Sequence, residues 1–191
     1  MAYLRFAVPE FDYAEFMGMD WSPPALKSAD EAAAMAEARA GGDDADLGCH
    51  PVALPDDFVA AYDLRGEFVH GLLCLLPDDG AHILGRSQGW YTQRALVVDS
   101  LDAGSDTAVI DWKTPRPVNV RLGPEDGVNI PNTAIYVVTA HGFADYWIGN
   151  RTIVDSGWTG DDGSQGFRVL SSALDDRNDF YDCNLTISWP A

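Results

Sequence analysis

Residues 146–158, YWIGNRTIVDSGW, contain two runs of alternating apolar residues that flank a Gly-Asn pair. Alternation with a period of two is typical of strands that bury one face. A Gly-Asn pair suits a two-residue turn whose backbone needs positive φ. The stretch therefore predicts a β-hairpin with Ile148 opposite Arg151 and Trp147 opposite Thr152.

The same strand pattern extends on both sides of this stretch, from Gly66 to the end of the chain. Short apolar or alternating runs are bounded there by Gly, Pro, Asn or Asp, as in strands joined by turns. No helix-length segment recurs between them, which argues against a parallel α/β sheet. We predict a mainly β fold, an antiparallel β-sandwich or jelly roll over 66–191. Its strands are expected at 67–76, 81–85, 93–101, 107–112, 118–123, 133–142, 145–149, 151–157, 166–172 and 182–189.

Residues 28–65 precede the sandwich and carry the helical signals. Ser28 is a good N-cap, and Glu31 three residues later completes a capping box before an alanine-rich run. Gly41 supplies a C-terminal stop. We expect one or two short helices in this helical segment and linker, the second at 55–64.

The first 27 residues are rich in aromatic side chains, are punctuated by proline, and show neither a helical nor a strand period. Burying one large aromatic side chain stabilises a protein by roughly 1.5–3 kcal/mol, so these side chains favour contact over solvent. We expect an extended arm over 1–27 that lies across its own domain or a neighbouring subunit. The side chains expected to make this contact are Phe6, Phe11, Tyr13, Phe16 and Trp21.

The chain of 191 residues is strongly acidic, with 30 acidic residues against 12 basic ones and a net charge of -18. Binding to nucleic-acid phosphates depends on clustered Lys and Arg, and here the arginines are scattered, so no direct nucleic-acid partner is expected. Two sources of the acidity stay open. One is adaptation to high salt, as in halophilic or marine microbes and their viruses, where salt screens the self-repulsion. The other is the codon bias of a GC-rich genome.

The sequence shows neither a membrane-spanning segment nor a secretory signal. No run approaches the ~18 consecutive apolar residues that a membrane-spanning helix needs. The N-terminal residues lack a long apolar core, so no signal peptide is expected.

Signatures of catalysis are sparse. Cys49, Cys74 and Cys183 cannot all pair within one chain and lack CxxC spacing, although a single pairing of Cys49 stays open. His70 and Cys74 have a spacing seen in metal ligands, but they fall in an apolar run, which favours core positions. The chain lacks the HExxH and P-loop motifs, and the serines in 86–90 and 103–109 show no nucleophile elbow, so we do not expect an enzyme.

Residues 145–158 are predicted to form a strand, a glycine turn and a second strand, and a loop and a final strand follow them. This pattern resembles the hairpin of concanavalin A-like and laminin-G-like sandwiches. The resemblance covers the C-terminal third of the chain and implies a β-sandwich with a carbohydrate-binding surface. Sugar binding uses aromatic faces for stacking and planar polar groups for hydroxyls. The candidate binding residues are Trp147, Trp158, Asp155, Trp90 and Tyr91, with an ordinary core hairpin as the alternative.

Acidic loops near the C-terminus offer the oxygen ligands that calcium takes. Their spacing does not match an EF-hand loop, and adjacent aspartates are expected in the surface loops of an acidic chain. Calcium is the one cofactor considered, with ligands drawn from Asp161, Asp162, Asp175, Asp176 and Asp179.

Three classes of function fit these features to different degrees. The first prediction is a structural protein of a larger assembly, a virion component such as a capsid-decoration, neck or tail protein. It accounts for the arm, and its partners would be other protein subunits in a homo-oligomer, capsid or tail. The alternative is a carbohydrate-binding module or receptor-binding tip, in an extracellular or cytoplasmic location if it is not part of a virion. A hydrolase explains little of the sequence.

Overall fold

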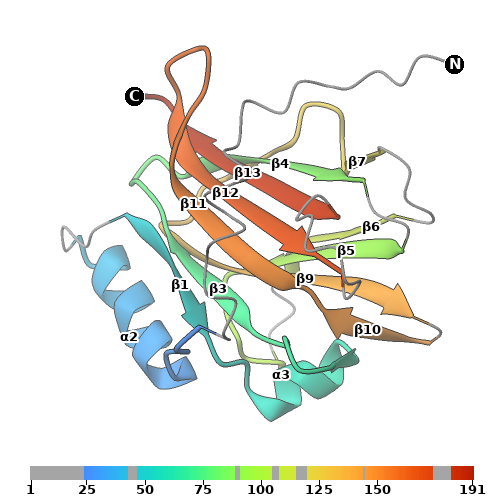
Figure 1. The fold of residues 1–191 in the computed structure, drawn as a ribbon. Helices are drawn as coiled ribbons and strands as arrows, with labels where there is room; N and C mark the ends of the chain where they lie inside the picture. Colours follow the sequence, from blue (N-terminus) through green and yellow to red (C-terminus); the bar gives the residue numbers. More distant parts are fainter. Residues whose placement is uncertain are drawn as a thin grey trace, which may run out of the picture.

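Two β-sheets pack face to face, and two helices lie against one of them, in the computed structural model (Figure 1). The structure describes residues 24–42, 47–88, 91–104, 108–114, 120–143, 145–173 and 182–191. The mainly β architecture and the β-sandwich predicted from the sequence are confirmed.

Sheet A has seven strands and is built around one long strand. Its members are β1 (Gly48–Val52), β2 (Leu64–Arg65), β3 (Gly71–Leu75), β5 (Thr92–Val98), β6 (Ala108–Lys113), β9 (Ala134–Phe143) and β10 (Tyr146–Gly149). One edge of β9 pairs with β5, which in turn pairs with β6. The other edge pairs first with β3 and then with β10. β1 extends the sheet beyond β3, and β2 extends it beyond β10 in a parallel pairing.

Sheet B has six strands in antiparallel pairings. They are β4 (Ala81–Ser87), β7 (Val120–Leu122), β8 (Val128–Ile130), β11 (Arg151–Thr159), β12 (Gln165–Ser172) and β13 (Cys183–Trp189). The order runs from β11 at one edge through β12 and β13 to β4, and β4 carries both β7 and β8 on its far edge.

Each of the ten strands expected from the alternation coincides with an observed strand. Three observed strands, β1, β2 and β8, were not expected. They have five, two and three residues, so a period of two has little length in which to show itself. β1 and β2 lie within the expected helical segment and linker, and they join that segment to sheet A.

The main core fills the space between the sheets. Every second side chain of the central strands points into it, as the pleat of a strand requires. Ile135 and Val137 enter from sheet A, and Val169, Leu185 and Ile187 enter from sheet B; all five are buried. The alternating runs of the sequence are therefore the two inner faces of the sandwich.

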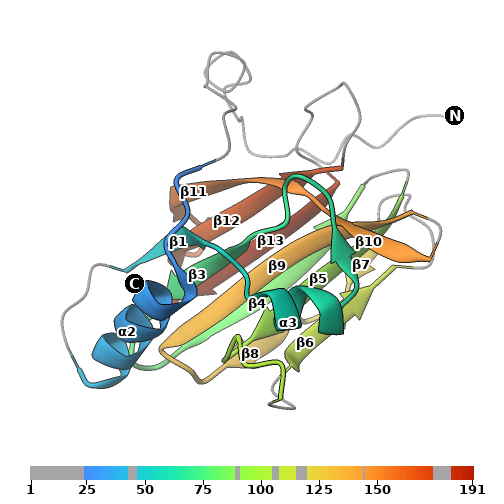
Figure 2. The ribbon, with the colours of Figure 1, turned by 90° about the horizontal axis from the view of Figure 1, so that it is seen from below.

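A second core lies on the other face of sheet A, beneath α2 (Ala29–Ala40) and α3 (Asp56–Ala61). Ala32 of α2 and Phe58 of α3 are buried against side chains such as Leu73 and Val138. Figure 2 shows the resulting three layers, with β11, β12 and β13 on one side of sheet A and both helices on the other. Sheet A is therefore buried on both faces.

The caps of α2 follow the sequence signals. The backbone N–H of Glu31 donates to Ser28 Oγ over 3.2 Å, and the N–H of Ser28 donates to the Glu31 carboxylate over 2.8 Å, so the capping box is confirmed. Arg39 fixes the other end of α2, where its Nε donates to the carbonyl of Leu76. Neither described helix is long and apolar enough to be a candidate for crossing a membrane.

The expected arm over 1–27 lies almost wholly outside the described residues. This applies to all five of its proposed contact side chains, Phe6, Phe11, Tyr13, Phe16 and Trp21. The arm therefore stays a prediction.

The hairpin expected at 146–158 is wrong. β10 pairs with β9 and β2 in sheet A, whereas β11 pairs with β12 in sheet B, so the chain changes sheets between them. Neither Gly149 nor Asn150 has the positive φ of a primed turn. Gly149 is needed for another reason, because a Cβ there would lie 2.7 Å from the carbonyl oxygen of Phe68.

Asn150 marks the crossing point and is 1% exposed. Its side-chain amide donates to Gln93 Oε1 over 3.1 Å and to Ser171 Oγ over 3.2 Å, and its Oδ1 accepts from His141 Nδ1 over 2.9 Å. Its backbone N–H donates to the carbonyl of Thr139. Asn150 therefore ties sheet A to sheet B, and we call this group of Asn150, Gln93, His141 and Ser171 the crossover junction.

Replacing Asn150 by glycine separates the two interpretations of this stretch. Glycine is favourable in a primed turn. At the crossover, however, glycine leaves the buried side chains that contact Asn150 without these hydrogen bonds. We expect Asn150→Gly to lower the free energy of unfolding by roughly 2–4 kcal/mol in urea denaturation. Asn129→Gly, at an exposed position of β8, is the matched control and should cost less than about 1 kcal/mol. Equal stability of the two variants would contradict the role of the junction.

Candidate functional site

The face of sheet B that points away from sheet A carries an ordered set of polar side chains. Phe167 and Val169 of β12 point into the core, so Arg168 between them points outward. The strand register places Asp155 of β11 and Thr186 of β13 directly opposite Arg168 on its two sides. Directly opposite residues share a face of the sheet, so these three side chains form one row.

A second row lies next to the first, closer to the β11–β12 loop. Its residues are Trp158 of β11, Gly166 of β12, Ser188 of β13 and His82 of β4. The register shift between Asp155 and Trp158 is a β-bulge, and it returns Trp158 to the same outward face as Asp155. Gly166 adds no side chain between Trp158 and Ser188.

Asp155 and Arg168 form an ion pair that gives this face its charge pattern. The Arg168 Nε and Nη2 atoms both reach Asp155 Oδ2, at 2.9 Å and 2.5 Å. The side chains are 26% and 15% exposed, so the pair is shielded on its sides and open to the surface. A planar donor and a planar acceptor are thus held side by side next to an indole ring.

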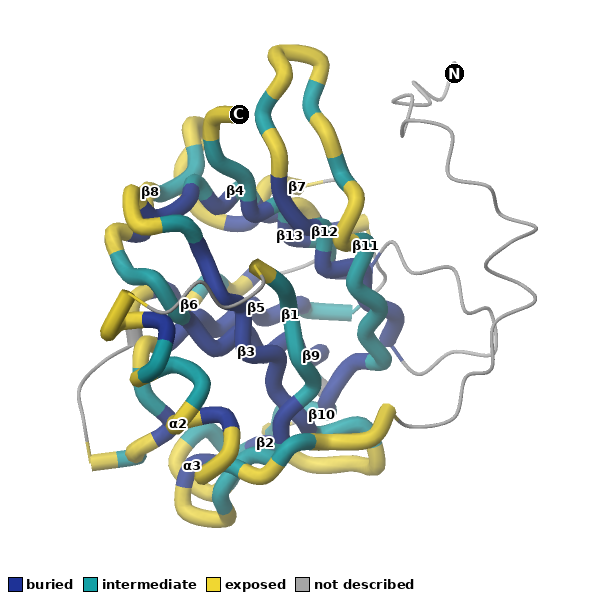
Figure 3. The backbone as a smooth tube through the Cα atoms, turned by 90° about the vertical axis from the view of Figure 1, so that its left-hand side faces the viewer, coloured by how far each residue is buried: buried dark blue, intermediate teal, exposed yellow. Residues whose placement is uncertain are grey.

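We call Asp155, Trp158, Arg168, Thr186 and Ser188 the Trp158 surface; all five are half-buried. The two described helices lie against sheet A, on the opposite side from this face of sheet B. Figure 3 shows the strands of the surface leading from the buried body of the sandwich into the exposed β11–β12 loop at its end. Among the sequence-predicted binding residues, the structure brings Asp155 and Trp158 together here.

Trp147 lies elsewhere, on the far side of sheet A. It packs against the second core, and the guanidinium carbon of Arg94 lies 5.3 Å from the centre of its ring. The same guanidinium lies 5.3 Å from the ring of Tyr62, so Arg94 is held between two aromatic rings. The face of the Trp147 ring that contacts Arg94 is therefore not accessible to a ligand.

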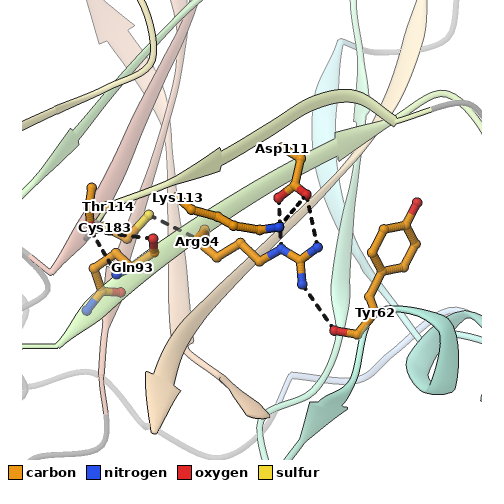
Figure 4. A network of polar contacts seen from close by, with 7 residues as sticks. All are labelled: Tyr62, Gln93, Arg94, Asp111, Lys113, Thr114 and Cys183. Atoms are coloured by element: carbon orange, nitrogen blue, oxygen red, sulfur yellow. Dashed lines mark hydrogen bonds and ion pairs between the residues drawn. The ribbon is translucent and has the colours of Figure 1, made fainter. Parts of the chain in front are cut away.

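Arg94 is further held by ion pairs, as Figure 4 shows. Its Nε and Nη2 donate to the two oxygens of Asp111 over 2.9 and 3.1 Å, and its Nη1 donates to the carbonyl of Tyr62. Burial acts to raise the pKa of Asp111, but the hydrogen bonds and charges of Arg94 and Lys113 outweigh it and lower that pKa. This group joins the segment after α3 to sheet A, so its role is structural.

The other predicted binding residues do not reach the Trp158 surface. The ring of Tyr91 stacks on His141 of the crossover junction, with centroids 5.2 Å apart. Trp90 lies outside the described residues.

Of the predicted calcium ligands, some lie within the described residues and others lie outside them. Asp161 and Asp162 are exposed in the β11–β12 loop, and Asp162 accepts hydrogen bonds from the backbone N–H and the hydroxyl of Ser164, which lower its pKa. Within the described part of the chain, no group of three or more His, Cys, Asp or Glu side chains is arranged to hold a metal ion. Asp175, Asp176 and Asp179 lie outside that part.

Sequence reasoning missed Arg168, Thr186 and Ser188, although a signal was present. Arg168 alternates with Phe167 and Val169, and the final strand alternates polar and apolar residues in the same way. This alternation indicates outward positions. It does not indicate which strands are neighbours, and the row depends on that.

Two histidines are buried at contacts between the sheets and have lowered pKa values. Burial lowers the pKa of His70 and outweighs its hydrogen bond to the carbonyl of Phe68; its Nε2 lies 2.9 Å from Thr152 Oγ1. Burial likewise lowers the pKa of His141 and outweighs its hydrogen bond to Asn150. Core positions for His70 and Cys74 are thereby confirmed.

Comparisons with known proteins give a coarse result. No protein-family model and no curated protein matches the chain. The C-terminal domain of the lectin BC2L-C from Burkholderia cenocepacia is similar at 13% identity and a TM-score of 0.47, covering 62% of this chain and 95% of that one. The high-affinity mannose-binding lectin of Ralstonia solanacearum is similar at 16% identity and a TM-score of 0.46, covering 62% and 96%. The lectin CV2L of Chromobacterium violaceum, in complex with alpha-methyl-fucoside, is similar at 15% identity and a TM-score of 0.44, again covering 62% and 96%.

These three proteins are lectins, and their likeness to this chain is in keeping with its β-sandwich. At such identities and TM-scores it carries no argument about a ligand of this chain. The β-sandwich implied by the concanavalin A-like resemblance is present, whereas the hairpin that carried the resemblance is not formed.

The buried histidines predict how stability depends on pH. In the unfolded chain a histidine takes up its proton near its usual pKa of about 6.5, whereas in the folded protein protonation begins only at lower pH. The free energy of unfolding should therefore fall as the pH drops from 7.5 to 5.5, by up to about 1.4 kcal/mol per pH unit for each histidine. Thermal melts in about 1 M salt measure this, since salt screens the acidic self-repulsion that weakens over the same range.

The double variant His70→Gln/His141→Gln isolates the cause. It cannot take up these two protons in the unfolded state, so its melting temperature should change less between pH 7.5 and 5.5 than that of the natural chain. An unchanged pH dependence in the double variant would assign the effect to other groups.

Proposed function

We propose that this protein is a non-enzymatic carbohydrate-binding β-sandwich that binds a neutral glycan on the Trp158 surface. The observation that carries the proposal is the strand register, which gathers an indole ring, an ion pair and two hydroxyls on one face of sheet B. The outward orientation of Trp158 supports it, since Trp158 is absent from the side chains that pack on either core.

The chemistry of the surface suits sugars. A pyranose ring presents an apolar face that stacks on an indole, and hydroxyls that both donate and accept. Asp155 offers acceptors, and Thr186 and Ser188 offer both donors and acceptors. The ion pair holds its own two groups in place, so little side-chain entropy is lost on binding.

The net charge narrows the class of glycan. A chain with a charge of -18 repels anionic saccharides such as uronic acids or sulfated sugars, especially at low salt. A neutral oligosaccharide meets no such penalty. The proposal is therefore for neutral hexose- or deoxyhexose-based glycans.

The assembly function expected from the sequence depends on the arm over 1–27, which lies almost wholly outside the described residues. The comparisons add no support for a virion component or for other protein subunits as partners. The glycan-binding proposal rests on described side chains and is therefore preferred. The proposed absence of catalysis rests on the sequence, which lacks the HExxH and P-loop motifs. Residues 85–89 have GxSxG spacing, but Ser87 is fully buried in β4, whereas the serine of a nucleophile elbow is exposed.

A glycan array that holds neutral and anionic saccharides tests the proposal. We expect binding to a subset of neutral glycans, and at least a tenfold loss of affinity in Trp158→Ala, which corresponds to about 1.4 kcal/mol of stacking. The variant should keep its melting temperature within a few degrees, because the ring lies outside both cores.

Two further variants act as controls for this test. Thr159→Ala changes the exposed neighbour of Trp158 and should leave binding unchanged. Trp147→Ala removes a ring from the second core, so we expect it to lower stability rather than to change glycan preference. The absence of signal on every neutral glycan, or equal binding by Trp158→Ala and the natural chain, would contradict the proposal.

Calcium is a separate proposal that rests on the acidic loops of the sequence, of which Asp161 and Asp162 are described. A bound ion stabilises the folded state in proportion to its saturation. If calcium binds, treatment with EDTA should lower the melting temperature by a few degrees, and calcium but not magnesium at equal concentration should restore it. An unchanged melting temperature would remove calcium from the proposal.

A further inference from the structure

Two of the three cysteines face each other across a pair of strands. Cys49 of the edge strand β1 lies directly opposite Cys74 of β3 in the antiparallel register. Opposite residues of such a pair have Cα atoms about 4.5 or 5.5 Å apart, depending on the hydrogen-bonding position. Disulfides bridge Cα atoms about 4.4–6.8 Å apart, so the backbone already has the spacing that a bond needs.

The side chains of the pair point toward each other. The two Sγ atoms are 2.7 Å apart, compared with about 2.0 Å in a disulfide. Cys74 is fully buried in the core between the sheets, and Cys49 packs against that core from the half-exposed edge. The packing thus confines both sulfur atoms at a separation that a small side-chain movement closes.

The third cysteine is kept apart from this pair. Cys183 lies on β13 of sheet B, opposite Ser87, and its Sγ contacts the carbonyl of Arg94 at 4.0 Å. It is fully buried, and burial raises the pKa of its thiol to about 12. The folded protein therefore offers one cysteine pair for bonding.

We propose that Cys49 and Cys74 form an intramolecular disulfide when the folded protein meets a small-molecule disulfide, and that this bond fastens the edge strand β1 to sheet A. The thiolate of Cys49, the more exposed partner, attacks the small disulfide and releases one small thiol. The thiolate of Cys74 then attacks the sulfur of Cys49 in the mixed disulfide and releases the second. Two protein thiols lose two protons and two electrons, and the oxidant becomes two small thiols.

The surroundings make this bond a lasting structural link rather than a fast switch. Burial, followed by the contact with Cys74, raises the pKa of Cys49 well above its usual range, so the reactive thiolate is scarce and the bond forms slowly. Once formed, the bond lies beside the apolar core, with the Cys74 side fully buried. It closes a loop between residues 25 positions apart, which includes α3 and β2.

A bond that closes a loop of this length restricts the unfolded chain more than the folded one. We therefore expect the oxidised protein to melt roughly 5–15 °C above the reduced protein. The bond should restrict the unfolded chain between Cys49 and Cys74, because this is the segment that it encloses.

The test uses the full chain, incubated for a day at about pH 8.5 with oxidised glutathione or with a phosphine reductant. Free thiols are then counted in denaturant, and proteolytic peptides are mapped by mass. We expect one free thiol after oxidation and three after reduction, a crosslinked peptide pair that contains Cys49 and Cys74, and the higher melting temperature. Three free thiols after oxidation, or a glutathione adduct on Cys49 without a crosslink, would overturn the proposal.

Two variants separate this bond from its alternatives. Cys49→Ser, at the half-exposed position, should fold, should keep two free thiols, and should show the same melting temperature with either reagent. Cys183→Ala is the matched control, and it should still form the crosslink and leave no free thiol. A crosslink in Cys49→Ser, or one that contains Cys183 in the natural folded chain, would overturn the assignment.

Discussion

The passage of the chain from one sheet to the other at Asn150 is the constraint on which the sandwich depends. A buried side-chain amide there hydrogen-bonds to Gln93 and His141 of sheet A and to Ser171 of sheet B at once. In a surrounding of low polarity such bonds are strong when complete and costly when broken. These hydrogen bonds therefore favour one relative position of the two sheets. The apolar contacts of the core are less directional, and they fill the space between the sheets in that position.

Sheet A is buried on both faces, whereas sheet B is not covered by the helices. The outward polar groups of sheet A are covered by the helices and are used internally, as the contacts of Arg94 with Asp111, Tyr62 and Trp147 show. Sheet B has one face in the main core and leaves the other uncovered by the described helices. Two tryptophans from one short stretch thus have different surroundings, since Trp147 is packed inside and Trp158 points outward.

The proposed glycan surface and the proposed disulfide lie on different strands. The Trp158 surface lies on β11, β12 and β13, whereas the cysteine pair joins β1 to β3 in sheet A. Both use the same physical device. Antiparallel register brings directly opposite side chains within contact distance on one face, and it thereby sets residues that are distant in sequence beside each other.

Most of the strands and the start of α2 could be predicted from local sequence patterns, whereas the short strands β1, β2 and β8 could not. The alternation placed ten strands, and Ser28 with Glu31 placed the start of α2, because propensity, period and capping act over a few residues. Asp155 and Trp158 were also among the candidate binding residues that the sequence indicated. The tertiary structure decided the pairing of those elements. A Gly-Asn pair between two strands is compatible with a turn and with a change of sheet, and long-range hydrogen bonds to Gln93 and Ser171 selected the second. Arg168, Thr186 and the partner of Cys49 likewise follow from strand register, which depends on contacts between distant segments that no local pattern records.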